Sequence, residues 1–307
     1  MTHLVVYLPL VLAGLFGSLA PGAARRLPPR IATWLLSGGA VLAATAAGTS
    51  LALLAFTLLA MDPEVAEQGG WSQAALRQND PVAVPVAAVA LAGLTVLVAC
   101  ALRVAVRRIR ALRQAYRLAA GMRERAGELV VVPSGEREAF ALPGRPGRIV
   151  ITSTTLRSLD AAQRKALLAH ERAHLVHRHH LHQAVVTVAA ALNPLLFRLP
   201  AATRLSCERW ADEDAADGAG RSAVAEALLR LGLGGHSEPM PGALAARGAD
   251  VATRVQALRR PAIRLRVWRA ALPVGVVVTA LAASAVAVDQ IHTLLELAQA
   301  ATQAALR

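Results

Sequence analysis

Long apolar runs constrain this chain more than any other feature of its sequence. A helix needs about 20 apolar residues to cross the hydrocarbon core of a bilayer. Four stretches of the 307-residue chain approach or exceed that length without any Asp, Glu, Lys or Arg: residues 4–24, 31–60, 82–102 and 270–288. The sequence therefore predicts a multi-pass, mainly α-helical membrane protein, with three spans near its beginning and one near its end.

The composition agrees with membrane burial and argues against nucleic acid as a partner. Hydrophobic residues make up 55% of the chain, and its mean hydropathy is +0.45. A net charge of +13 can indicate a nucleic-acid-binding protein. Here, however, the arginines cluster beside the apolar runs, where basic residues set membrane orientation. We therefore expect the lipid bilayer as a partner and no direct binding of nucleic acid.

The distribution of arginines also predicts one orientation in the membrane. Basic residues favour cytosolic loops, and here they follow the first and third spans and precede the last. The acidic loop 62–81 is expected outside, as is the N-terminus. No Arg or Lys precedes the first span, so we interpret it as a retained anchor rather than a signal peptide. The predicted location is a bacterial plasma or inner membrane, with the polar region between spans three and four in the cytosol.

Three predicted domains follow from this layout. They are an N-terminal membrane domain with three transmembrane helices (residues 1–106), a cytosolic α+β domain (107–265), and a final transmembrane helix with a short outer tail (266–307).

The cytosolic region shows short strands followed by one long helix. Residues 128–133 and 148–152 have the composition of strands. Residues 161–183 contain strong helix formers without Pro or Gly, after a capping box begun by Asp160. The apolar stretch 185–199 is short for a span, and we expect a helix buried in the domain or against the membrane surface.

The predicted helix carries the sequence HERAH at residues 170–174. Residues four apart on a helix project side by side, so His170 and His174 can occupy two corners of a tetrahedral zinc site. Glu171 then lies beside the metal, where it can take a proton from a bound water. This pattern indicates a metal-dependent hydrolase with Glu171 as its general base.

A catalytic zinc usually needs a third protein ligand, and three residues compete for that place. His177 lies on the same face, but three ligands from one straight helix rarely surround an ion. His180 would need a helix break, and no glycine signals one. Glu208 is favoured, because it begins a helical segment in which Asp212 shares its face and can fix a ligand histidine through a hydrogen bond. The role of His177 stays open, and His179 is expected on the opposite helix face.

The chain resembles the gluzincin membrane peptidases, which include the HtpX, CAAX prenyl-protease and BlaR/MecR types. The resemblance rests on residues 149–152 and 168–174, and the segments 193–197 and 207–216 are closest to the BlaR/MecR type. It implies zinc ligands at His170, His174 and Glu208, a catalytic Glu171, and one Zn²⁺ per chain. The best-known BlaR/MecR members carry a penicillin-binding sensor domain, which residues 289–307 are too few to form.

The expected function is therefore that of an integral-membrane zinc endopeptidase with a cytosolic active site. Its substrate is expected to be a protein or peptide, such as a cytosolic transcriptional repressor cleaved for regulation. One alternative is a quality-control protease of the HtpX type, and another is a zinc-binding membrane transducer without catalysis. The sequence specifies neither the physiological target, nor the signal, nor the oligomeric state.

Overall fold

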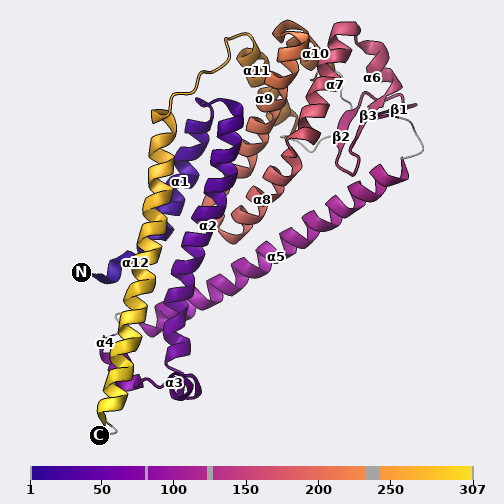
Figure 1. Cartoon of the computed structure of the whole chain (residues 1–307). Helices are drawn as coiled ribbons and strands as arrows, with labels where there is room; N and C mark the ends of the chain where they lie inside the picture. Colours follow the sequence, from indigo (N-terminus) through magenta and orange to yellow (C-terminus); the bar gives the residue numbers. More distant parts are fainter. Residues whose placement is uncertain (1, 80–81, 123–126, 233–242, 306–307) are drawn as a thin grey trace.

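The computed structural model describes residues 2–79, 82–122, 127–232 and 243–305 (Figure 1). Four of its helices are long and apolar enough to cross a membrane, as predicted. They are α1 (Leu8–Ala24), which continues the short helix η1 (Thr2–Tyr7), α2 (Pro29–Ala60), α5 (Val84–Gly121) and α12 (Trp268–Ala305). The protein is therefore a mainly helical, multi-pass membrane protein.

Helices α1, α2 and α12 pack side by side and form the core of the membrane bundle (Figure 1). Phe16 of α1 and Leu36 of α2 are fully buried in it. A Cβ atom at Gly39 would lie only 2.2 Å from the Phe16 ring. The absence of a side chain at Gly39 therefore lets the aromatic ring of one span pack directly on the backbone of the next.

The predicted outer loop folds into two short helices, α3 (Pro63–Gly69) and α4 (Gln73–Asn79). The Asp62 side chain caps α3 by accepting hydrogen bonds from two backbone N–H groups. The Trp71 indole donates to the carbonyl of Ala60 at 3.0 Å, and the Ser72 N–H donates to the carbonyl of Ala298 at 3.1 Å. The residues after the last predicted span, up to 305, continue α12 as a helix, so this part of the predicted tail is ordered structure against α4.

Helix α5 forms an arm that leaves the bundle (Figure 1). It continues past the predicted end of the third span at residue 102 to Gly121. Its far end packs beneath the sheet, where Ala119 contacts Val130, Leu142 and Val150. The proposed domain boundary at residue 106 lies within this continuous helix.

The small sheet has the strand order β1-β3-β2. Strands β1 (Leu129–Val132) and β3 (Arg148–Thr152) are parallel and agree with the two strands expected from the sequence. Strand β2 (Ala139–Leu142) was not predicted; it pairs antiparallel with β3, with Phe140 opposite Val150. Since β3 is central, one edge of β2 has no strand partner among the described residues, and β2 packs against α7.

The helix after the sheet begins as predicted but ends early. After the short α6 (Ser153–Ser158), α7 (Ala161–Val176) starts with a reciprocal capping box between Asp160 and Gln163. The prediction of one helix through residue 183 is wrong, because the chain breaks and restarts as α8 (His179–Leu192). The break is made by Arg178, which has a left-handed backbone with φ of 49° although it is not glycine. Such a conformation costs a non-glycine residue about 1–2 kcal/mol, so contacts around the break must offset it.

The apolar stretch 185–199 packs against the spans. It comprises the end of α8, the 3₁₀ turn η2 (Pro194–Leu196) and the start of α9 (Leu199–Ala219). Helix α8 contacts α2 and α5, and Val186 and Leu196 share the buried cluster of the membrane bundle. A Cβ at Gly17 of α1 would lie 2.3 Å from the Leu195 carbonyl oxygen. Through these contacts, residues 185–199 pack α8 and the start of α9 against the membrane helices α1 and α2.

Two further helices complete the region around α9. They are α10 (Arg221–Gly232) and α11 (Ala243–Leu258), which pack on each other and on α9. The sequence of residues 231–248 is rich in Gly and contains Pro239 and Pro241, which predicts a loop; residues 233–242 lie outside the described residues, and residues 243–248 belong to α11. The basic, partly amphipathic segment 251–265 predicts a helix along the membrane surface, but the structure places its Arg254 in the protein interior at 9% exposure.

Candidate metal centre

Three predicted ligands meet where α7 packs against α9. The Nε2 atoms of His170 and His174 lie 3.1 Å apart. The two carboxylate oxygens of Glu208 lie 3.6 Å from them, one oxygen facing each ring. Tetrahedral ligands about 2.0–2.1 Å from a zinc ion are roughly 3.4 Å apart. Two imidazoles and a carboxylate with this spacing fit a zinc ion that keeps one coordination position open.

Asp212 and Arg254 contact the ligand residues: Asp212 bonds to His170, and Arg254 bonds to Asp212 and Glu208. The Nδ1 atom of His170 donates to Asp212 at 3.1 Å. Arg254 donates to both carboxylate oxygens of Asp212, at 2.8 and 2.7 Å, and lies 2.9 Å from Glu208. Asp212 has the position expected of a residue that orients a ligand histidine. The sequence did not indicate Arg254 as part of the site, because it lies 42 residues after Asp212 in a segment with the composition of a basic surface helix.

Burial, hydrogen bonds and neighbouring charges shift the pKa values of His170, His174 and Glu208 in different directions. Burial alone would lower the pKa of His170, but hydrogen bonds to Asp212 and Glu208 raise it to about 10. Burial lowers the pKa of His174 to about 4. Burial would raise the pKa of Glu208, yet its hydrogen bond with His170 and the charge of Arg254 lower it. These directions favour a protonated His170 beside a neutral His174, whose Nε2 atom can accept the Nε2–H of His170.

Glu171 lies at the bottom of a cleft next to this group. Its side chain is buried, and burial raises the pKa of its carboxyl group. Two adjoining cavities of about 680 and 350 Å³ are both lined by His170, Glu171 and Glu208. Both are also lined by Ala139 and Phe140 of β2. The edge strand therefore forms a wall of the cleft that contains the predicted ligands and base.

The break at Arg178 brings His179 to His174. The expectation that His179 faces away from the site is wrong, because it assumed one straight helix. The Nδ1 atoms of His174 and His179 lie 2.9 Å apart. A His174 ring that uses Nε2 as an acceptor or ligand atom carries its proton on Nδ1, which can then donate to His179. Burial lowers the pKa of His179 to about 3 and keeps this ring neutral and able to accept.

His177 and His180 lie outside the ligand group. His177 bonds to Asp214, with 2.5 Å between Nε2 and the carboxylate, and stacks on Trp210 at 4.2 Å between ring centres. His180 lines the smaller cavity, but the metal-binding group found among the described residues contains Glu208 instead. His177 thus supports the turn after α7, which helps to offset the strained backbone of Arg178.

Aromatic contacts connect this region with span α2. The Nδ1 atom of His182 lies 2.9 Å from the hydroxyl of Ser37, and its ring meets Trp34 edge-on at 4.6 Å. The guanidinium of Arg30 lies over the Trp210 ring, 5.9 Å from its centre. The N-terminal end of α2 is therefore part of the packing around the histidines.

Comparison with known proteins agrees with this geometry. The profile of Peptidase family M48 matches residues 105–214, from the second half of α5 into α9. The matched region contains both histidines, Glu171 and Glu208. No curated protein and no solved structure matches the chain. Four helices long and apolar enough to cross a membrane accompany the matched region, and the protein is a membrane metallopeptidase whose residues 105–214 are similar to peptidase family M48.

Proposed function

We propose that this metallopeptidase is a zinc endopeptidase that cleaves protein substrates in the cleft between β2 and α7. The observation that carries the proposal is the convergence of three ligand atoms, from His170, His174 and Glu208, beside the buried carboxyl group of Glu171. One Zn²⁺ per chain is expected there. It would polarise the substrate carbonyl and lower the pKa of a bound water toward about 7.

Glu171 performs the proton transfers in this proposal. Its carboxylate takes a proton from the attacking water and then delivers one to the leaving nitrogen of the peptide. Both steps require a carboxyl group that holds a proton briefly near neutral pH. The raised pKa that burial gives Glu171 suits this role.

Three further residues position the ligands. Asp212 accepts the Nδ1–H of His170 and so turns Nε2 toward the metal. His179 does the same for His174 by accepting its Nδ1–H. Arg254 neutralises Asp212 and Glu208, whose two negative charges would otherwise be buried together.

The free edge of β2 offers a binding surface for the substrate backbone. An extended peptide can add to a sheet edge through main-chain hydrogen bonds. Because Ala139 and Phe140 line both cavities, a peptide bound along β2 would pass Glu171. This arrangement favours unfolded or extended segments as substrates.

We further propose that the centre faces the cytosol and that the substrate is a regulatory protein such as a transcriptional repressor, as in BlaR/MecR-type peptidases. The arginines beside the spans support the orientation. The resemblance of residues 193–197 and 207–216 to the BlaR/MecR type supports a regulatory protein as the substrate. These two segments lie where η2 contacts α1 and where α9 supplies Glu208.

Substrate trapping tests which proteins this peptidase cleaves. A Glu171→Gln protein should retain substrates without cleaving them, and Glu136→Gln serves as a matched control because Glu136 is exposed and lines neither cavity of the cleft. Recovery of one small DNA-binding protein with Glu171→Gln alone supports regulatory proteolysis. Recovery of many unrelated membrane proteins would instead support quality control of the HtpX type. Equal recovery with both variants would contradict binding in this cleft.

A further inference from the structure

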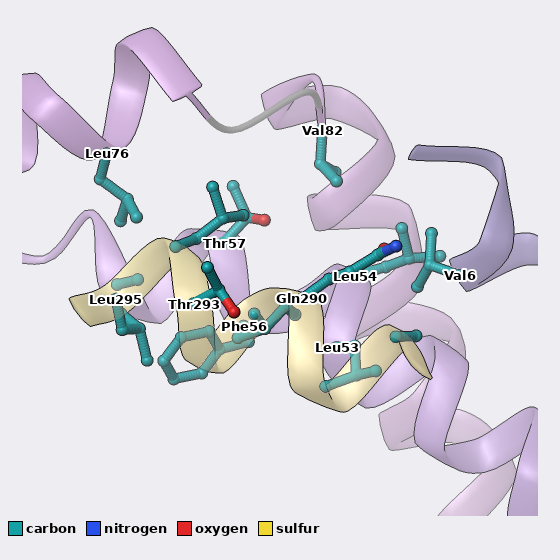
Figure 2. A pocket seen from close by; sticks show the side chains of 14 residues that line it. Val6, Leu53, Leu54, Phe56, Thr57, Leu76, Val82, Gln290, Thr293 and Leu295 are labelled. Carbon is teal, nitrogen blue, oxygen red and sulfur yellow. The ribbon is translucent and has the colours of Figure 1, made fainter. Parts of the chain in front are cut away.

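The ends of α2 and α12 that lie away from the metal centre enclose a second cavity (Figure 2). Its volume is about 230 Å³, and residues of α2 and α12 form most of its lining. Val6 of η1, Leu76 of α4 and Val82 complete the wall. Five parts of the chain therefore meet around one space that the peptidase mechanism does not use.

Helix lengths place this cavity at the outer edge of the bilayer. The hydrocarbon core is about 30 Å thick, whereas α2 with 32 residues and α12 with 38 residues are about 48 and 57 Å long. The inner ends of these helices are level, because Arg269 at the start of α12 donates to the carbonyl of Arg26 just before α2. Both helices therefore extend past the opposite membrane surface, and the cavity lies between these extensions.

The lining is apolar with a few uncharged polar groups. No described residue that lines the cavity is charged, and Thr57, Gln290 and Thr293 are its polar side chains. Figure 2 shows Thr57 and Thr293 near each other, while the Gln290 side chain extends toward Leu54. The Gln290 amide makes no hydrogen bond with another described residue. Apolar walls with a small number of polar groups are typical of small-molecule sites.

We propose that this cavity binds a small, neutral, single-chain amphiphile from the outer side of the membrane. The alkyl chain would pack on Phe56, Leu76 and Leu295, and a hydroxyl or carbonyl head would bond to the Gln290 amide. The volume corresponds to roughly eight water-sized groups at ~30 Å³ each, which excludes a two-chain phospholipid. A carboxylate or phosphate would lose hydration without gaining a cationic partner in the lining.

Photolabelling tests the proposal with the full-length protein in nanodiscs of neutral lipid. The probe is 1-octanol carrying a diazirine, and labelled peptides are identified by mass spectrometry. Labels are expected on residues 53–60 and 287–295, with displacement by unlabelled 1-octanol but not by octanoate. Gln290→Leu should reduce labelling about fivefold, the effect of one neutral hydrogen bond. Gln303→Leu on the same helix is the control, since Gln303 does not line the cavity.

Three results would overturn the proposal: equal labelling of the exposed residues 98–100 of α5, equal displacement by octanoate, or equal labelling of the two glutamine variants. If Gln290→Leu fails to fold, Thr293→Val replaces it and Thr302→Val is its control. Both threonines donate to a backbone carbonyl four residues earlier, and Thr293 alone lines the cavity. Labelling should be unchanged by Glu171→Gln, so the outcome is independent of the proposed peptidase mechanism.

Discussion

The ring of His179 contacts the ring of His174 through their Nδ1 atoms, 2.9 Å apart, although five positions separate them. On a straight helix these two side chains would diverge. The left-handed backbone of Arg178 between α7 and α8 brings them together. The strained backbone of Arg178 therefore affects the candidate metal centre: it places His179 where it can accept the Nδ1–H of His174, which would leave Nε2 of His174 free to bind zinc.

His179→Ala should weaken zinc binding about 10–100-fold, the usual effect of losing a residue that orients a metal ligand. Competition with a chromophoric chelator measures the affinity. His182→Ala is the matched control, because His182 lies on the same helix and contacts Ser37 rather than a ligand. Equal affinities for the two variants would show that His179 does not position His174.

Zinc affinity should rise with pH across the neutral range. The pKa of His170 is raised to about 10, so this ring carries an extra proton at pH 7. Zinc takes the imidazole without that proton, so binding releases one proton and the apparent affinity rises about tenfold per pH unit. Calorimetry in buffers of different ionisation enthalpy counts the protons. A zinc affinity that is constant between pH 6.5 and about pH 9 would contradict this assignment.

Arg254→Lys should destabilise the domain by roughly 1.5–3 kcal/mol, because lysine keeps the positive charge but cannot reproduce the paired hydrogen bonds to Asp212 within the buried group. Arg204→Lys is the matched control, since Arg204 pairs with Asp250 at the surface, where such pairs contribute about 0–1 kcal/mol. Thermal unfolding in detergent, with chelator present, compares the two. Similar losses of stability would show that Arg254 acts only as a surface charge.

Gly17→Ala should destabilise the protein by about 1–3 kcal/mol, as overpacking does in other cores. Its new methyl group would lie 2.3 Å from the Leu195 carbonyl oxygen, where backbone must move. Gly22→Ala on the same helix meets no atom within 4 Å and should be neutral or slightly stabilising. Thermal unfolding separates these outcomes, and equal stability of both variants would contradict the close contact between α1 and η2.

Local signals in the sequence predicted much of the fold. The four spans follow from apolar length, and the start of α7 follows from the capping box of Asp160 and Gln163. The proximity of Glu208 to the two histidines also follows from a local argument, because Asp212 one turn later shares its helix face.

Long-range partners account for what the sequence did not predict. Arg178 has no intrinsic preference for a left-handed backbone, so the break depends on the packing of His177 and His179 around Trp210. Arg254 becomes part of the centre only when α11 packs on α9, which no local pattern indicates. Strand β2 is only four residues long and is defined by its pairing with β3.

The most direct test of the proposed mechanism measures zinc content and peptide cleavage together in the wild-type protein and Glu171→Gln. We predict about one zinc per chain in both, with cleavage of an unstructured protein substrate reduced at least 10²–10⁴-fold in the variant. Glu136→Gln should match the wild type in both measurements. Normal cleavage by Glu171→Gln with zinc bound would contradict the account, because Glu171 would then not be the general base.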